Sequence, residues 1–215
     1  VDVTRYMEMD NEMRWNDNGN QGTEYATYPK DVIENYYQLN AEKPNQYPNT
    51  DWMDLILKPN APRQSHVVSI SAGSDAVKTK ASIAYDKIGA LYEGRSYQRI
   101  TARFNNDATI NDMLSASLDF FLKRSISEQP SVDPMYFGMM SAPIYPAVWS
   151  DGRIASGKQG ANIYGQLKYG GFRDDWYNTV GGKAQLDFSP IEGLQLSAVI
   201  SPNFGFNKGK DFIKA

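Results

Sequence analysis

The chain has 215 residues, 41% of them apolar, and a net charge of −3, which fits one large folded domain or two small ones. Its pI of about 5.2 argues against nucleic acid as a partner, because phosphate binding requires a basic surface. The chain has no cysteine, which excludes disulfides, thiolate metal ligands and cysteine nucleophiles, and no run of ~18 apolar residues, which excludes a transmembrane helix.

The first 65 residues are polar and rich in Asn, Tyr and Pro, and we predict that 1–65 is a long loop with at most two short helices. One helix is indicated by apolar and aromatic residues at helical spacing, namely Val32, Ile33, Tyr36 and Tyr37. The other begins at Thr50, a favourable N-cap residue, and ends at Pro59.

From residue 66 the hydrophobic period changes to two, which is typical of β-strands. Four strands are predicted over 66–125, where apolar rows such as Val68, Ile70 and Ala72 alternate with polar residues. Residues 126–178 return to irregular sequence rich in Pro, Gly and aromatic residues, and they are predicted to form a second long loop. Two further strands follow over 179–215.

Tight turns and longer loops alternate between these strands, so all the tight turns would lie at one end of an antiparallel, up-and-down, all-β sheet. Transmembrane β-barrels have this arrangement, with short periplasmic turns and long extracellular loops. Four charged residues in the strand centres lie opposite the apolar rows and are predicted to face a wet lumen: Arg99, Arg103, Asp119 and Lys183. If they faced lipid, each of the three basic residues would destabilise the protein by about 2–4 kcal/mol near the bilayer midplane. A soluble sheet with one solvated face predicts the same alternation, but not the ordered connections.

Six strands leave two bare edges, which closed barrels remove, so the chain is either a soluble protein or a slice of a larger barrel. Three stretches occur in an order that resembles SusC/RagA-type TonB-dependent outer-membrane transporters. They are "YPNTDWMDLI" at 47–56, a strand ending in "SAGS" at 71–74, and a strand with Arg99, Arg103 and Asn105. The resemblance covers about residues 45–125 well and the rest by strand pattern alone.

The resemblance implies a segment of a 22-stranded barrel, without the plug that fills such barrels. It also implies TonB-driven import of glycans or peptides in the outer membrane of a Gram-negative bacterium. The implied partners are the lipid bilayer, a SusD-like lipoprotein at the extracellular face, the TonB system acting through the missing plug, and an oligosaccharide or peptide cargo. The alternative from the residues alone is a soluble all-β carbohydrate-binding domain.

No constellation of catalytic residues stands out, so we predict that the chain is not an enzyme and needs no metal or cofactor. The only histidine, His66, lies at a strand start and has no Ser-His-Asp context, which disfavours a hydrolase. Aromatic residues of the second long loop could contact a ligand or a lipoprotein lid, and the candidates are Trp149, Tyr164, Trp176 and Tyr177. The open alternative is that these rings pack a small core within the loop.

Overall fold

A computed structural model describes residues 2–214 and divides them into two compact units. One unit, here called the strand unit, comprises residues 60–129 and 172–212. The other, the helical unit, comprises the described residues up to 59, residues 130–171 and the described residues from 213 onward. The helical unit is therefore assembled from segments that lie far apart in the sequence.

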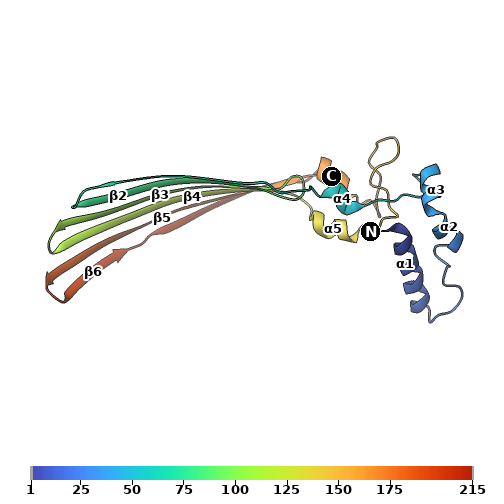
Figure 1. Cartoon of the computed structure of the whole chain (residues 1–215), viewed down its shortest axis with the longest axis horizontal. Helices are drawn as coiled ribbons and strands as arrows, with labels where there is room; N and C mark the ends of the chain where they lie inside the picture. The colour runs from blue at the N-terminus through green and yellow to red at the C-terminus, as the bar shows by residue number, and fades with distance from the viewer. Residues whose placement is uncertain (1, 215) are drawn as a thin grey trace. The chain divides into compact units, whose positions relative to one another are not determined.

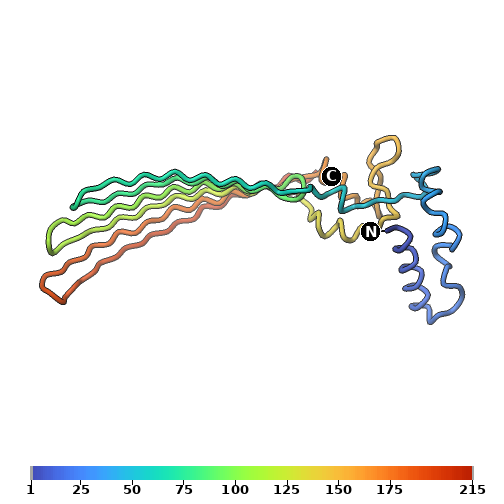
Figure 2. Tube along the Cα trace, viewed as in Figure 1, coloured from blue at the N-terminus to red at the C-terminus, as the bar shows by residue number. Residues whose placement is uncertain are grey.

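The strand unit is one antiparallel sheet in which consecutive strands are neighbours (Figures 1 and 2). Its spatial order runs from β1 to β6, and β7 pairs with β5. The strands are β1 (Arg63–Gly73), β2 (Val77–Gly89), β3 (Ser96–Asn111), β4 (Leu114–Pro130), β5 (Phe172–Ile191), β6 (Leu194–Ile200) and β7 (Asn203–Phe212). The antiparallel, up-and-down fold expected from the sequence is confirmed, and in this chain the sheet stays open.

Seven strands are present in residues 2–214 where six were expected, because Pro202 interrupts the last one. Ala184 pairs with Ile200 and Gly181 pairs with Asn203, so the register continues unchanged across the break. Proline has no N–H to donate to the ladder. The hydroxyl of Ser201 donates instead to the carbonyl of Gly182 at 3.1 Å, so β6 and β7 act as a single partner of β5.

The tight turns lie at one end of the sheet, which we call the turn end (Figure 2). They comprise residues 74–76, 112–113 and 192–193. The connections at the opposite end, the loop end, are longer and comprise residues 90–95 and 131–171. The alternation of short and long connections is thus a property of the structure as well as of the sequence.

The helical unit contains six helices in the described residues: α1 (Val3–Asp17), α2 (Lys30–Glu34), α3 (Tyr36–Glu42), α4 (Trp52–Ile56), α5 (Pro134–Met140) and α6 (Ile163–Tyr169). Among the residues described, none of the helices is long and apolar enough to cross a membrane. Two small cores hold the unit together. One is centred on Val3, Met7, Ile33 and Tyr36, and the other on Trp52, Ile56, Ala147 and Ile163.

The two long connections predicted from the sequence fold together. The indole N–H of Trp52 donates to the carbonyl of Ala142 at 2.9 Å, and the backbone N–H of Thr50 donates to the carbonyl of Pro143 at 3.0 Å. The side chain of Asn45 both donates to and accepts from Ser150, at 2.9 Å in each case. These bonds join residues about a hundred positions apart, so the two long connections fold against each other.

The expectation of at most two short helices in residues 1–65 is wrong, because α1 to α4 all lie in the described part of this segment, and α1 has 15 residues. Its only buried apolar residues are Val3 and Met7, so it lacks the apolar stripe that sequence reasoning requires. Local signals hold it instead. The carboxylate of Asp2 accepts from the backbone N–H groups of Thr4 and Arg5 at 2.9 and 3.3 Å, which caps the first turn.

The predicted irregular segment 126–178 is too long at both ends. Strand β4 continues to Pro130, and β5 begins at Phe172, so residues at each end of the segment are in the sheet. The sequence "FRDDWYN" at the start of β5 does not alternate between apolar and polar residues. A strand prediction based on a period of two therefore did not include it.

Truncation of Trp52 should disrupt the helical unit. The side chain is 3% exposed and joins the two long connections, so Trp52→Ala should cost about 3–5 kcal/mol of stability in that unit. Limited proteolysis of the full-length gene product that carries this chain would measure the loss as faster cleavage within 2–59 and 130–171. Tyr169→Ala is the control, because this ring is 61% exposed. Equal cleavage of the two variants would contradict the assignment of the core.

Strongly alkaline pH should weaken the same unit through Tyr36. Burial, followed by the charge of Tyr47, raises the pKa of Tyr36 from 10.0 to about 12, and its hydroxyl donates to the carbonyl of Pro48 at 2.8 Å. The folded unit therefore holds the phenolic proton more tightly than the unfolded chain does. This stabilisation is complete below pH 10 and is lost as the pH rises toward 12. Hydrogen exchange between pH 8 and 11.5 should show the loss in the wild type, and a smaller one in Tyr36→Phe.

Candidate functional site: two opposite faces of one sheet

The strand register separates the side chains into two faces. Arg99 lies opposite Asp86 and Ser125, whereas Ile100 lies opposite Tyr85 and Arg124. The face with Arg99, here called the polar face, carries Ser69, Ser82, Asp86, Arg103, Asn105, Asp119 and Lys123. The face with Ile100, here called the apolar face, carries Val68, Ile70, Ile83, Phe104, Leu118, Phe120 and Leu122.

Strand β5 continues both faces. A Cβ atom added to Gly181 would come within 2.5 Å of the ring of Phe121, a polar-face residue, so the side chains at odd positions of β5 belong to the polar face. Lys183, Gln185 and Asp187 are therefore polar-face residues. The apolar face continues through even positions of the last strands: Leu186, Phe188, Leu196, Ile200, Phe204 and Phe206.

Near the loop end, the polar face is organised by an ion pair. The guanidinium of Arg99 donates two hydrogen bonds to one carboxylate oxygen of Asp86, from Nε at 3.1 Å and from Nη2 at 2.8 Å. The other oxygen of Asp86 accepts from the hydroxyl of Ser65 at 2.8 Å. The carboxylate is buried while the guanidinium is partly exposed, so the pair joins β1, β2 and β3 and still presents positive charge to its surroundings.

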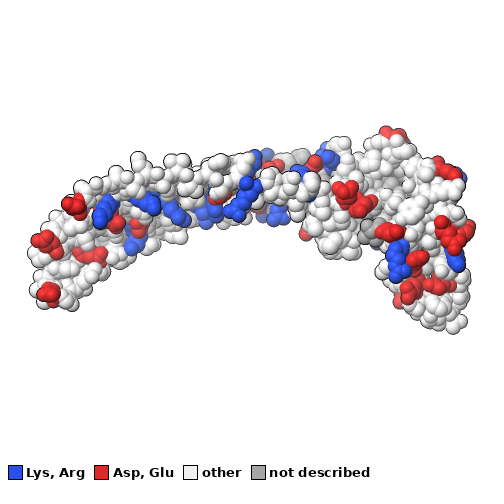
Figure 3. Space-filling view, viewed as in Figure 1, with Lys and Arg blue, Asp and Glu red and all other residues white. Residues whose placement is uncertain are grey.

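Toward the turn end, the polar face holds carboxylates that accept from neutral groups. Asp119 accepts from the side-chain amide of Asn105 at 2.6 Å. Asp187 accepts from the hydroxyl of Ser197 at 2.5 Å and from the amide of Gln185 at 2.8 Å. In the space-filling view, acidic side chains gather at the turn end of the sheet and basic ones lie further along it (Figure 3).

The four residues predicted to face a lumen all lie on the polar face. Arg99, Arg103 and Asp119 come from β3 and β4, and Lys183 comes from β5. The structure therefore brings together the residues that the sequence placed on one side. Their contact with a lumen remains a prediction.

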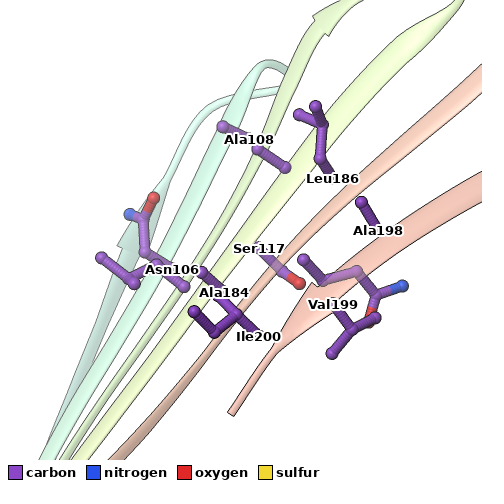
Figure 4. Close-up of a pocket in the computed structure, with 11 residues that line it drawn as sticks. Asn106, Ala108, Ser117, Ala184, Leu186, Ala198, Val199 and Ile200 are labelled. Carbon is purple, nitrogen blue, oxygen red and sulfur yellow. The ribbon is translucent and has the colours of Figure 1, made fainter. Parts of the chain in front are cut away.

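The apolar face is exposed, and no second layer within the strand unit covers it. Val68, Ile70 and Ile200 are 69%, 69% and 66% exposed. A shallow depression of about 490 Å³ lies toward its turn end, where small residues separate larger ones (Figure 4). Ala108 and Ala116 line it together with Ala184, Leu186 and Ala198. Asn106, Ser117 and Gln185 also line the depression, so its surface is mainly, but not wholly, apolar.

Two of the aromatic candidates lie in the helical unit, with different surroundings. Tyr164 is on α6 and packs against the core of Trp52, Ile56 and Ile163, in line with the alternative that it fills a core within the loop. The ammonium of Lys168 lies 5.7 Å from its ring centre. Trp149 is half-buried in a turn where its backbone N–H donates to the carbonyl of Arg153 at 2.8 Å, and it lies outside both cores.

The other two candidates, Trp176 and Tyr177, are not in a loop, because both belong to β5. Adjacent residues of a strand point to opposite faces. Trp176 is on the apolar face opposite Lys208, and Tyr177 is on the polar face opposite Asn207. The two rings therefore cannot contribute to one binding site.

Two acidic residues of the chain that could suggest a cation site, Asp51 and Asp175, have structural roles. The carboxylate of Asp51 accepts from the backbone N–H of Asp54 at 3.0 Å and caps α4, and Asp175 pairs with Arg173 at 2.9 Å. Within residues 2–214, no group of three or more His, Cys, Asp and Glu side chains is placed to hold a metal ion.

Sequence reasoning missed Asp86, the partner of Arg99. The signal was available, because a hairpin between β2 and β3 closed by residues 90–95 places position 86 opposite position 99. Reading the hairpin register, in addition to the alternation, identifies this pair.

Cysteine accessibility should distinguish the two faces in the full-length gene product. This chain has no native cysteine, so a single cysteine in it, with any elsewhere in the product replaced, gives a clean signal. Leu118→Cys, on the apolar face, should react with a lipid-soluble maleimide in membranes. Asp119→Cys, on the polar face, should react with a water-soluble one. Equal reactivity of both variants toward the lipid-soluble reagent would contradict a lipid-facing apolar side.

Comparison with known proteins agrees with this geometry. No protein-family model matches the chain. The TonB-dependent receptor P26 of Formosa agariphila is 26% identical over 175 residues, which cover 79% of this chain and 17% of that receptor. The chain thus spans about a sixth of the curated relative's length.

Solved structures show the same fold. The structure of the RagAB peptide transporter matches with a TM-score of 0.62 and 19% identity, covering 95% of this chain and 26% of that one. The RagAB peptide importer in the "open-open" state matches with a TM-score of 0.63 and 18% identity, covering 98% of this chain and 26% of that one. At this identity the structural likeness concerns the fold. The relatives are receptors and transporters rather than enzymes, in agreement with the prediction that the chain is not an enzyme.

The sequence relative, the fold and the two-faced sheet point to one kind of protein of the Gram-negative outer membrane. The chain is identified as similar to a segment of SusC/RagA-type TonB-dependent transporters.

Proposed function

We propose that the chain forms part of the barrel wall, and the long connections above it, in a TonB-dependent importer of the outer membrane. The observation that carries the proposal is a single sheet whose exposed apolar face is backed by a face of charged and hydrogen-bonded residues. In a bilayer, the first face meets acyl chains and the second lines a wet lumen.

The length of the apolar rows supports this reading. On β4 the row runs from Leu114 to Leu122, and on β5 from Val180 to Phe188, so each covers nine residues. A tilted strand needs about 9–11 residues to cross the hydrocarbon. The strands themselves are longer and extend past the apolar rows toward the loop end.

The soluble carbohydrate-binding domain fits less well. A β-sandwich buries its apolar rows between two sheets ~10 Å apart. Here the seven strands of the described chain form one sheet, and large side chains such as Val68 and Phe206 remain more than half exposed. In water this surface would drive aggregation, whereas in lipid it is satisfied.

The long connections are proposed to meet cargo and a SusD-like lipoprotein at the extracellular side. Helix α5 presents exposed Tyr136, Met139 and Met140, and flexible or aromatic side chains of this kind are enriched at protein interfaces. Trp149, half-buried and outside both cores, stays the best aromatic candidate for a ligand or lid contact. The TonB system would act through a plug segment outside this chain.

The cargo is proposed to be a peptide or an oligosaccharide, two polar oligomers that suit a hydrated and charged lumen. The RagAB relatives of known structure are a peptide transporter and importer, and that cargo is known for those proteins alone. The polar face is compatible with either class, because it offers both carboxylates and guanidinium groups. The experiment must therefore compare the two cargo classes directly.

Deletion of the gene that carries this chain, followed by complementation, tests the proposal. Loss of growth on oligopeptides or on oligosaccharides as the only nutrient, restored by the full-length gene, is the expected result and identifies the cargo class. A protonophore should abolish uptake of the labelled cargo, because TonB-driven transport draws on the inner-membrane proton gradient. Unchanged growth on both classes, or recovery of the protein from the soluble fraction, would contradict the proposal.

A further inference from the structure

Four basic residues form a border on the apolar face where its apolar rows end. They are Lys87, Arg124, Lys208 and Lys210, here called the basic border. Lys87 lies opposite Gln98, Arg124 opposite Ile100 and Lys208 opposite Trp176, and Lys210 follows two residues beyond Lys208. All four lie toward the loop end of the sheet, and all are exposed.

In the bilayer of the proposed function, the border would lie where hydrocarbon changes to headgroups. Arg124 follows Leu114, the first residue of the apolar row on β4, by ten positions. At a rise of about 3.3 Å per residue this is ~33 Å along the strand, or ~25 Å along the membrane normal for a strand tilted by about 40°. That height equals the ~25 Å apolar band of a transmembrane barrel.

The cations of the border are available to an external anion. In the described part of the chain, none of the four forms an ion pair with an acidic side chain. The ammonium of Lys208 lies 5.9 Å from the ring centre of Trp176, and that of Lys210 lies 5.7 Å from the ring centre of Phe172. Aromatic faces thus hold two of the ammonium groups beside the apolar surface without neutralising them.

The acidic residues on the same part of the face do not cancel this charge. Glu128 accepts from the hydroxyl of Ser96 at 3.4 Å, and Asp174 lies opposite Lys210 in the register. The four cations of the basic border and these two carboxylates together leave a net positive charge on this part of the face. Phe172 and Phe212 stack at 5.6 Å beside it and add apolar area at the same level.

We propose that the apolar face binds a phosphorylated lipid, with its phosphate at the basic border and its acyl chains on the apolar rows. The inference rests on the proposed outer-membrane function. Charge complementarity selects an anionic headgroup, and the adjoining apolar rows select a molecule that carries acyl chains on the same side. A free anion would satisfy the cations but leave the apolar rows and the aromatic rings without a partner.

Lipid binding to the full-length protein in detergent tests this inference by native mass spectrometry. The probe is diphosphoryl lipid A, compared with the same lipid without phosphates and with inorganic phosphate. The test variant carries Lys87→Gln, Arg124→Gln, Lys208→Gln and Lys210→Gln. The matched control carries Lys78→Gln, Lys80→Gln, Arg103→Gln and Lys123→Gln, the same change of charge on the polar face.

The expected result is about tenfold weaker binding of diphosphoryl lipid A by the test variant, equivalent to ~1.4 kcal/mol, with wild-type binding by the control. Equal binding by the two variants would overturn the inference, and so would equal affinity for the lipid without phosphates. Displacement of the lipid by inorganic phosphate at low millimolar concentration would indicate a free-anion site and overturn it too.

The same variants separate this inference from the proposed function. If the test variant reaches the outer membrane and imports cargo at the wild-type rate, but lipid binding is unchanged, only the lipid site is wrong. If the wild-type protein is absent from the outer-membrane fraction, the proposed function fails first.

Discussion

The alternation of side chains along antiparallel strands is the constraint on which the rest of the strand unit depends. A shift of one residue between any two strands would move the side chains of one strand to the opposite face of the sheet. The register must therefore be maintained from β1 to β7. The register is maintained even at Pro202, where the hydroxyl of Ser201 donates the hydrogen bond that proline cannot donate. The cost of an error is unusually high in this sheet, because Arg103 or Asp119 would then lie among the apolar rows.

The ion pair of Asp86 and Arg99 helps to fix that register. The carboxylate is buried and accepts from two neighbouring strands, so it is satisfied only when Ser65, Asp86 and Arg99 are aligned. A slipped pairing would leave a buried charge without a partner, which costs more than a lost surface contact. The polar face therefore contributes to specificity as well as to hydration.

The sheet could be predicted from the sequence because period-two alternation is a local signal. The apolar rows, the alternating connections and the shared face of Arg99, Arg103, Asp119 and Lys183 followed from it. The start of β5 could not be predicted in this way, since "FRDDWYN" carries aromatic and acidic residues on both faces. Because the start of β5 was not predicted, Trp176 and Tyr177 were predicted to be loop residues. The pairing of β5 with β7 shows that their side chains lie on opposite faces of the sheet.

The helical unit was harder to predict because its stability is not local. The core of Trp52 and Ile56 is completed by Ala147 and Ile163 from the other segment, and Ile144 packs against the first core. Residues 130–171 alone therefore show too few apolar positions to indicate a fold. Helix α1 has a capped start but buries only two apolar side chains. Single long-range hydrogen bonds, such as that from Trp52 to Ala142, have no signature in either segment.

Equal charges on the two faces of the sheet have different physical consequences. On the polar face, a cation such as Lys123 is solvated by water or paired within the protein, and its cost is small. At the edge of the apolar rows, in the proposed bilayer, Arg124 on the same strand would have hydrocarbon on one side and would depend on a headgroup for its remaining solvation. A neutral residue at position 124 would not need an anion for its solvation. The proposed lipid site therefore requires a membrane whose leaflet at the loop end is rich in phosphate.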